Sequence, residues 1–377
     1  MTLHRPFLEE ALALAEQGRG WTSPNPVVGA LVVKDGEVVG RGCHRRFGAP
    51  HAELEALHDA GAKARGAALY VTLEPCNHYG KTPPCTEAIV KAGVKTVVLG
   101  CLDPNPKSRR GLEALREKGV EVVEGVLERA CREANAPFFK RMRAGLPLVS
   151  AKWAMTADGK IATARGDSKW ITSPAARAHA HRLRGEHDAV LVGIGTVLTD
   201  APLLTVRMGL ADAGSPGWQP RRVLLDSKAR TPLDAPLWTA ENGGPITVFV
   251  SMEAPEERIR ALEEKGAEVV ALPAVSGALP VRGVLEKLAE QGVLSVFVEG
   301  GAEVLGSFLD ARLVDRVYVF VAPKIVGGRD GVTAVRGLGV ERVAECQQMA
   351  VAGVQQLGED VLLEGRLGAW EWLEASH

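Results

Sequence analysis

The sequence predicts two consecutive α/β domains, which we place at residues 1–145 and 146–377. The length of 377 residues is more than one hydrophobic core usually serves. Short apolar runs of strand length alternate with segments of helical periodicity, which is typical of a layered α/β sheet. The alternation stops in a basic stretch, 129–143, that runs into Gly145 and Pro147, and a second alternation begins there. We therefore place the domain boundary at this point.

In the first domain, residues 1–20 are a candidate amphipathic helix, and strands and helices then alternate. Apolar runs predict strands at 29–33, 69–73, 96–100 and 120–123. Apolar residues at helical spacing predict helices at 51–61, 86–93 and 111–118, the first two closed by glycine. The Phe138-Phe139 pair lies in the basic stretch. We interpret it as docking a linker onto one of the domains.

The second domain has six predicted strands with helices between them, at 148–154, 189–192, 222–226, 247–250, 295–298 and 317–321. Two glycine pairs follow strands, Gly193 with Gly195 and Gly300 with Gly301, and backbone amides after the second pair could cradle a phosphate. Neither pair completes the G-x-G-x-x-G pattern of a Rossmann site, and an ordinary turn explains each equally well. Segment 226–230 offers a hydroxyl and cations to a nucleotide 2′-phosphate, or it is a solvated loop.

The most specific chemical pattern is His51-Ala52-Glu53 followed by Pro75-Cys76 and Cys85. One imidazole and two thiolates supply three zinc ligands, leave the fourth coordination position open and so allow the metal to activate water. Glu53 stays free of the metal and can carry protons. Zinc-dependent nucleobase deaminases use the same order, H-x-E then P-C-x-x-C. Here eight residues, 77–84, separate the two cysteines, so this segment must form a loop.

The strand before Cys76 and the helix after Cys85 place both thiols near a helix N-terminus, where the helix dipole favours thiolate. Two other interpretations stay open at this point. The residues could be unrelated surface and core positions, with the cysteines as small buried hydrophobes. Alternatively, His78 could close a purely structural zinc site as a fourth ligand, although that would remove the open position.

Composition limits the class of function. A formal net charge of −1 argues against the broad basic surface of a nucleic-acid binder, so we expect no nucleic-acid partner. No apolar run approaches the roughly twenty residues needed to cross a bilayer, which predicts no membrane association. Six cysteines at irregular spacing favour a reducing cytoplasm over a disulfide framework. We expect a cytoplasmic enzyme that acts on a small molecule.

Over almost its whole length the sequence resembles the bifunctional riboflavin-biosynthesis deaminase/reductase family. The matching motifs are SPNPVVGA at 23–30, PHAE at 50–53, LEPC at 73–76, TPPC at 82–85 and DPNP at 103–106, followed in the second domain by KWAM at 152–155, DGK at 158–160, WIT at 170–172, HRLR at 181–184, residues 192–200, LTVR at 204–207 and VEGG at 298–301. Two positions depart from the family pattern. Ala201 stands where the family usually has a second Asp, and Trp153 replaces a more usual Leu.

The resemblance implies a cytidine-deaminase-like α/β/α first domain and a dihydrofolate-reductase-like α/β second domain. It implies zinc-dependent hydrolytic deamination of 2,5-diamino-6-ribosylamino-4(3H)-pyrimidinone 5′-phosphate. NADPH-dependent reduction of the ribosyl side chain to ribityl would follow in the second domain. A homo-oligomer is also expected. The alternative is a single-activity zinc deaminase with a non-catalytic second domain.

The family match assigns roles to individual residues. Glu53 is the expected catalytic acid and base, with zinc on His51, Cys76 and Cys85. Expected substrate contacts are Asn25, His44, Lys81 and Asn105 in the deaminase, and Ser168, Arg184, Leu204, Arg207 and Glu299 in the reductase. Expected NADPH contacts are Ala154, Trp170, Thr196, Asp200, Ser227, Gly301, Ala302 and Glu303.

Physical chemistry supports some of these assignments more than others. The forked guanidinium donors of Arg184 and Arg207 suit a phosphate dianion, and Asn25 offers both a donor and an acceptor to a pyrimidine edge. Asn25 could equally be a turn residue between two prolines, and Trp170 could be a core residue rather than an apolar platform for the cofactor. The sequence indicates no general acid for the reduction.

Overall fold

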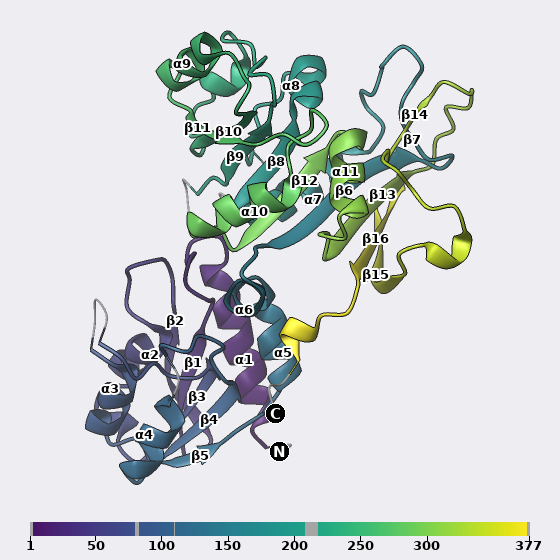
Figure 1. The fold of residues 1–377 in the computed structure, drawn as a ribbon. Helices are drawn as coiled ribbons and strands as arrows, with labels where there is room; N and C mark the ends of the chain where they lie inside the picture. The colour runs from purple at the N-terminus through teal and green to yellow at the C-terminus, as the bar shows by residue number, and fades with distance from the viewer. Residues whose placement is uncertain (1–2, 80–82, 109, 208–217, 375–377) are drawn as a thin grey trace. The chain divides into compact units, whose positions relative to one another are not determined.

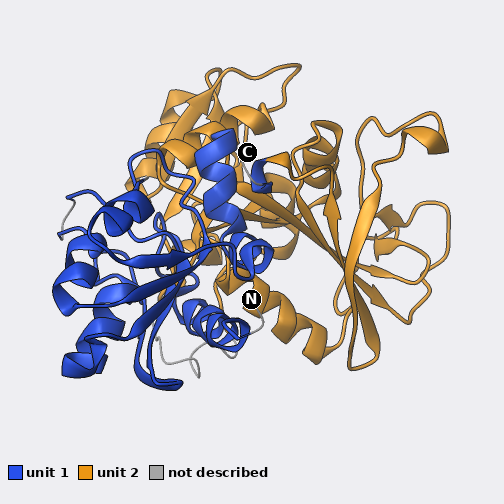
Figure 2. Cartoon of the chain, turned by 90° about the horizontal axis from the view of Figure 1, so that it is seen from below, with its two compact units in different colours: residues 1–145, 372–377 blue, residues 146–371 orange. Residues whose placement is uncertain are grey.

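The computed structural model describes residues 3–79, 83–108, 110–207 and 218–374. The chain divides into two compact units, shown in Figure 2. The first unit comprises Met1–Gly145 together with Trp372–His377, and the second comprises Leu146–Glu371. The expected second domain, 146–377, therefore extends beyond the second unit by the last six residues of the chain. Backbone carbonyls of Trp372 and Leu373 accept hydrogen bonds from Arg143 and Arg132, which ties this end to the first unit.

The first unit contains a five-stranded sheet in the order β2-β1-β3-β4-β5. The strands are β1 (Gly29–Lys34), β2 (Glu37–Cys43), β3 (Ala68–Leu73), β4 (Thr96–Cys101) and β5 (Glu121–Val123). Strand β1 pairs antiparallel with β2 and β3, and β3, β4 and β5 run parallel. Four of these strands were predicted, and β2 is additional.

Helices cover both faces of this sheet, as Figure 1 shows. They are α1 (Arg5–Ala15), α2 (Ala52–Ala60), α3 (Cys85–Ala92), α4 (Gly111–Glu117), α5 (Glu128–Ala134) and α6 (Ala136–Ala144). Helices α2, α3 and α4 lie on one face, and α1 and α5 lie on the other. Small residues let α2 approach the sheet closely. A Cβ atom on Gly42 would lie 2.2 Å from the carbonyl oxygen of Ala52, so only glycine permits this packing at the start of α2.

The basic stretch that was interpreted as a linker is helical, forming α5 and α6. The side chain of Phe139 is fully buried and that of Phe138 is 5% exposed. Both aromatic side chains thus belong to the first unit. Phe138 also lines the cavity described below, a role that was not predicted from the sequence.

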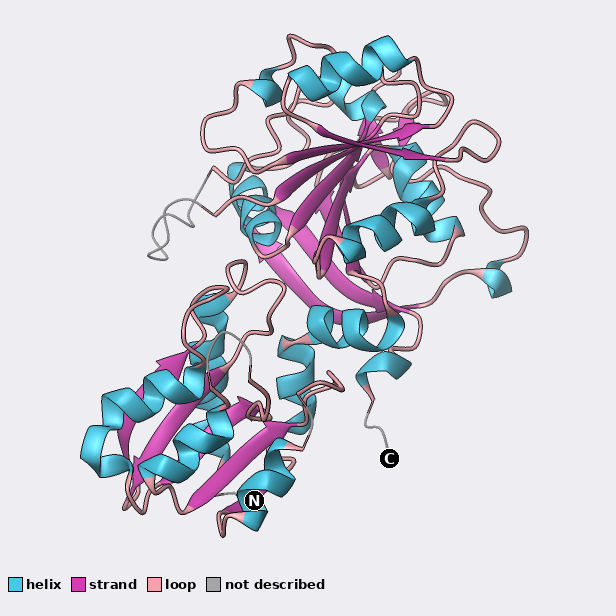
Figure 3. Cartoon of the chain, turned by 60° about the vertical axis from the view of Figure 1, so that its left-hand side comes forward, coloured by secondary structure: helices cyan, strands magenta, loops and turns pink. Residues whose placement is uncertain are grey.

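The second unit is built on a nine-stranded sheet in the order β11-β10-β9-β8-β12-β6-β13-β16-β15, whose strands fan out in Figure 3. The strands are β6 (Leu148–Thr156), β8 (Ala189–Gly193), β9 (Arg221–Leu225), β10 (Ile246–Ser251), β11 (Glu268–Leu272), β12 (Ser295–Gly300), β13 (Arg316–Ala322), β15 (Met349–Leu357) and β16 (Asp360–Leu367). Neighbours from β11 to β13 run parallel, whereas β16 and β15 are antiparallel to their neighbours. All six predicted strands are present. Strands β11, β15 and β16 were missed, as was the small pair β7 (Lys160–Ala162) and β14 (Val332–Thr333).

The helices of the second unit are α7 (Pro174–Gly185), α8 (Ile194–Asp200), α9 (Glu256–Glu264), α10 (Val281–Glu290) and α11 (Ala302–Asp310). Helix α8 follows β8 directly, and α11 follows β12. Because the carboxyl ends of parallel strands meet at one edge of a sheet, residues after β8, β9 and β12 lie at the edge where α/β sheets bind ligands. Among the described residues, no helix is long and apolar enough to cross a membrane.

Candidate functional site

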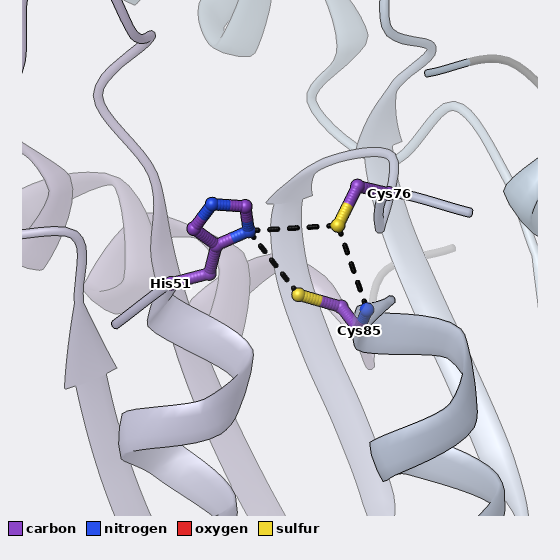
Figure 4. Close-up of side chains that lie close together, drawn as sticks. All are labelled: His51, Cys76 and Cys85. Atoms are coloured by element: carbon purple, nitrogen blue, oxygen red, sulfur yellow. Dashed lines mark hydrogen bonds between the residues drawn. The ribbon is translucent and has the colours of Figure 1, made fainter. Parts of the chain in front are cut away.

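Three predicted metal ligands converge in the first unit, as Figure 4 shows. His51 immediately precedes α2, Cys76 follows β3 in a loop, and Cys85 is the first residue of α3. Their ligand atoms all lie within 4.8 Å of one another. The Nδ1 atom of His51 is 3.3 Å from Sγ of Cys85 and 3.6 Å from Sγ of Cys76. The backbone N–H of Cys85 also points at the Cys76 sulfur, as expected at a helix N-terminus.

This geometry fits a zinc ion. In a tetrahedral zinc site, a nitrogen ligand and a sulfur ligand lie about 3.6 Å apart, given Zn–N and Zn–S bonds of about 2.1 and 2.3 Å. The two observed nitrogen–sulfur distances, 3.3 and 3.6 Å, are close to that separation. Among the described residues, the cluster has no fourth His, Cys, Asp or Glu. His78 is exposed and stands outside the cluster, which favours an open coordination position over a closed structural site.

The pKa values of the two cysteine thiols are shifted in opposite directions. Hydrogen bonds from Cys85 and His51 lower the pKa of the Cys76 thiol to about 4. The pKa of Cys85 is raised by its hydrogen bond to Cys76 and by burial, because a second thiolate would form beside the first. The hydrogen bond to Cys76 also raises the pKa of His51. A divalent cation would relieve this conflict by compensating both thiolate charges.

Glu53 is the second residue of α2, and it is 3% exposed. Burial raises the pKa of its carboxyl group to about 7. The side chain lines the same cavity as His51 and Cys76. A buried carboxyl group beside a metal position, with a pKa near neutral, can both accept and return a proton.

The cavity has a volume of about 420 Å³, large enough for a drug-sized ligand. Three of the four predicted substrate contacts of the deaminase, Asn25, His44 and Asn105, line it. The fourth, Lys81, lies outside the described residues. Nδ2 of Asn25 is 3.1 Å from Nε2 of His44, whose Nδ1 is 2.9 Å from the carbonyl oxygen of Pro50. Burial lowers the pKa of His44, so this pair presents a neutral hydrogen-bonding surface.

Two carboxylates of the cavity were not predicted as site residues. Glu74 precedes the Pro75-Cys76 dipeptide, and Asp103 follows β4. Both are 7% exposed and line the cavity, and burial raises the pKa of Asp103 to about 6. Both residues stand inside the quoted motifs LEPC and DPNP. The acidic residue type at these two motif positions is visible in the sequence, but its burial in the cavity is not.

In the second unit, the structure brings together the predicted residues Arg184 and Glu299. Nη2 of Arg184 donates to Oε2 of Glu299 over 2.9 Å, and its Nε donates to the other carboxylate oxygen. Nη1 of Arg184 donates to the carbonyl oxygen of Thr205. Although burial alone would raise the pKa of Glu299, the Arg184 guanidinium lowers it. The guanidinium of Arg184 is thus already engaged on two sides.

Lys152 and His181 interact electrostatically with this pair. Burial lowers the pKa of Lys152 on β6. The Arg184 guanidinium also lowers it, whereas the Glu299 carboxylate acts in the opposite direction. Burial and Arg184 lower the pKa of His181 to about 4, with a smaller contribution from the exposed Arg207. Lys152 was missed by sequence reasoning, although a lysine within an apolar strand is an unusual residue.

The predicted cofactor residues gather partly at the carboxyl edge of the sheet. The backbone N–H of Gly301 donates to Oγ1 of Thr196 over 3.1 Å, which joins the residue after β12 to helix α8. Ser227 follows β9, Ala154 lies on β6 and Asp200 ends α8. Ala302 is buried, whereas Glu303 is exposed and pairs with Arg336 at 3.1 Å.

The remaining predicted residues differ in exposure. Trp170 is 65% exposed with the Arg177 guanidinium 4.4 Å from its ring centroid, which excludes core packing for this side chain. Ser168 is partly exposed. Leu204 is 4% exposed and packs in a hydrophobic cluster with Val192 and Val197. Its side chain therefore faces the core.

Two family models match the chain. Residues 147–363 match the RibD C-terminal domain, and residues 1–101 match the zinc-binding region of cytidine and deoxycytidylate deaminases. The riboflavin biosynthesis protein RibD of Aquifex aeolicus is 44% identical over 96% of this chain and 98% of that protein. The RibD protein of Escherichia coli is 40% identical over 95% of this chain and 97% of its own length.

Solved structures give the same result. The diaminohydroxyphosphoribosylaminopyrimidine deaminase/5-amino-6-(5-phosphoribosylamino)uracil reductase of Thermotoga maritima matches with a TM-score of 0.84 and 40% identity, over 97% of this chain and 99% of that chain. A form of Acinetobacter baumannii RibD matches with a TM-score of 0.87 and 35% identity, over 98% and 99% of the two chains. Both units of the chain are thus covered by one similar protein in each case.

Proposed function

The chain belongs to the RibD family of bifunctional riboflavin-biosynthesis enzymes, and from this premise we propose the substrates and the residues that act in its two reactions. Its first unit is a zinc-dependent deaminase, and its second is an NADPH-dependent pyrimidine reductase. The proposed substrate of the first is 2,5-diamino-6-ribosylamino-4(3H)-pyrimidinone 5′-phosphate. The second would then reduce the ribosyl group of the deaminated product to ribityl.

The observation that carries the deaminase assignment is the three-ligand cluster that opens, together with Glu53, into a cavity of about 420 Å³. Zinc held by His51, Cys76 and Cys85 would supply a water molecule that ionises near neutral pH. Glu53 would take a proton from that water and deliver it to the departing nitrogen, so that water adds to the ring carbon and ammonia leaves. Asn25, His44 and Asn105 would hold the pyrimidine and ribose groups.

In the reductase we assign the substrate phosphate mainly to Arg207. Glu299 and the carbonyl oxygen of Thr205 already engage the guanidinium of Arg184, whereas Arg207 is exposed. Arg184 would then orient Glu299 toward the substrate. NADPH would lie along the carboxyl edge of the sheet, between the hydrogen-bonded residues Thr196 and Gly301 and the exposed ring of Trp170.

Reduction of the ribosyl group needs a proton as well as the hydride, and we assign the proton to Lys152. Arginine side chains do not release protons in proteins, and the pKa of Glu299 is lowered. His181 is neutral at pH 7 because its pKa is lowered to about 4. The lowered pKa of Lys152 makes its ammonium group the better proton donor of this cluster.

A two-step assay tests the function. The zinc-loaded protein is given the diaminopyrimidinone ribosyl phosphate without NADPH, ammonia is measured, and NADPH is then added and its oxidation followed. Ammonia release followed by stoichiometric NADPH oxidation is the expected result. Ammonia without NADPH oxidation would favour the single-activity alternative. The absence of ammonia from folded, zinc-loaded protein would refute the assigned substrate.

We also propose that the protein forms a homo-oligomer through β15. This strand is the edge of the nine-stranded sheet, and its sequence MAVAGVQQL carries no charge. Val351 and Val354 on it are 59% and 65% exposed. A long, uncharged edge strand is a template for pairing with another strand, and two copies related by a twofold axis would pair β15 with itself.

The six cysteines support the cytoplasmic location that we propose. All of them are free, and four of the six are buried. Thiols that bind a metal must stay reduced, which a reducing compartment ensures.

A further inference from the structure

A single buried carboxylate, that of Glu74, joins both ends of one loop in the deaminase cavity. Its Oε2 atom accepts a hydrogen bond from the backbone N–H of Asp103 over 3.2 Å. Its Oε1 atom accepts from the backbone N–H groups of Gly111 and Leu112 over 2.9 and 3.3 Å. Asp103 begins the segment after β4, and Gly111 begins α4. Glu74 thus holds the start and the end of the segment together.

The environment of Glu74 favours this arrangement. The residue is 7% exposed, and a carboxylate loses hydration when it is buried. Three backbone N–H donors replace the hydrogen bonds to water that its two oxygens lose on burial. Helix α4 begins without a side-chain cap of its own, so Glu74 also satisfies two of its first N–H groups.

The segment that Glu74 holds carries polar groups into the cavity. Asp103, Asn105 and Ser108 all line it. Within the segment, the N–H of Asn105 donates to Oδ1 of Asp103 over 2.8 Å, and the N–H of Ser108 donates to the carbonyl oxygen of Asn105 over 3.0 Å. These internal hydrogen bonds fix the conformation of the described part of the segment, so its position relative to the cavity depends on how its two ends are held.

Glu74 also fixes this segment relative to the metal ligands, because only Pro75 separates it from Cys76. The far end of the segment packs against the same dipeptide. A Cβ atom on Gly111 would lie 2.1 Å from the carbonyl oxygen of Pro75, so backbone meets backbone at this point. The distance between the substrate-facing segment and the metal position is therefore set by Glu74 and by this contact.

We propose that Glu74 is a positioning residue for the deamination, which holds Asn105 and its neighbours at the correct distance from the metal site. The proposal rests on the proposed function of the cavity. Glu74 acts through the segment that it holds and not on the reacting atoms. Its loss should therefore weaken substrate binding more than it slows the chemical step.

The test is Glu74→Gln in the full-length, zinc-loaded protein. Glutamine keeps the size of the side chain but replaces one acceptor oxygen by an NH₂ group that cannot accept from a backbone N–H. We expect kcat/KM of deamination to fall between about ten- and a hundredfold, mainly through KM. Zinc content should stay at the wild-type level, and the reductase activity on deaminated substrate should be unchanged.

The control is Glu113→Gln, an exposed glutamate in the first turn of the same helix, which should behave like wild type. A second variant, Gly111→Ala, leaves the carboxylate intact but forces the segment away from Pro75, and it should raise KM in the same way. Combining Glu74→Gln with Asn105→Ala should cost less than the sum of the two single effects, because both changes remove one function.

Hydrogen exchange reads the arrangement independently of activity. The amides of Asp103, Gly111 and Leu112 should exchange faster in Glu74→Gln than in wild type, and the amides of β3 should not. Unchanged exchange and unchanged KM would overturn the proposal, as would a loss of activity that follows zinc content alone. Faster exchange in a protein whose wild type releases no ammonia would instead refute the proposed function and leave Glu74 with a structural role only.

Discussion

Replacing Glu53 by glutamine separates the proton chemistry of the deaminase from metal binding. The change keeps the size of a side chain that is 3% exposed, and it leaves His51, Cys76 and Cys85 untouched. The amide cannot accept the proton of the attacking water or deliver one to the departing nitrogen. General acid–base groups contribute about 10²- to 10⁴-fold to a rate. We therefore expect kcat to fall about 10³-fold, which corresponds to about 4 kcal/mol in the activation free energy.

Ammonia release without NADPH measures this loss, and two readouts on the same sample control for folding. Zinc content should equal that of wild type, and NADPH oxidation on deaminated substrate should be unchanged, because the reductase lies in the other unit. The matched variant is Glu55→Gln on the same helix, whose side chain pairs with Arg45 outside the cavity. A zinc-loaded Glu53→Gln protein that keeps more than about a tenth of the wild-type kcat would remove Glu53 from the mechanism.

Four further experiments test the other assignments. Removing the metal with a chelator should abolish ammonia release but spare NADPH oxidation on deaminated substrate, and adding Zn²⁺ should restore the first activity. Arg207→Ala should raise the reductase KM for the phosphorylated substrate at least about tenfold while the KM for NADPH stays constant; equal changes in both would discredit the phosphate contact. Lys152→Met should lower the reductase kcat by about 10²-fold, and an unchanged kcat would exclude it as proton donor. Val354→Lys on β15 should shift the protein to a smaller species in light scattering, whereas Leu338→Lys, in an exposed loop, should not.

The periodicity of the sequence predicted the parallel core of both sheets, because buried parallel strands are continuous apolar runs. Strand β12 and strand β8 are examples, with nearly every residue buried. Strand β15 was missed although its first six residues form an apolar run, and most of its residues are exposed, so it does not share the burial that marks the parallel strands. The helices α5 and α6 were missed because their basic residues suggested a linker, and only burial of the two phenylalanines reveals their place in the first unit.

The zinc ligands could be predicted because metal chemistry restricts both residue type and order. His51 and Glu53 are close in sequence, and the two cysteines flank a single loop. The pairing of Arg184 with Glu299 could not be predicted, because it joins residues 115 positions apart on α7 and β12. The family resemblance assigned each of the two residues to the substrate individually. Only the structure shows that the guanidinium of Arg184 is bound by the carboxylate of Glu299. For this reason we assign the phosphate contact mainly to Arg207.

Glu74 illustrates why positioning groups escape sequence reasoning more often than reacting groups do. A reacting group is constrained by its own chemistry, so residue type and spacing are informative. The role of Glu74 depends instead on backbone N–H groups of Asp103, Gly111 and Leu112, and a backbone N–H is present in almost every residue type. The side-chain pattern of a sequence therefore does not predict which backbone N–H groups will bind a given carboxylate. The measurement that isolates this role is therefore the hydrogen exchange of those amides, because it reads the same atoms that define it.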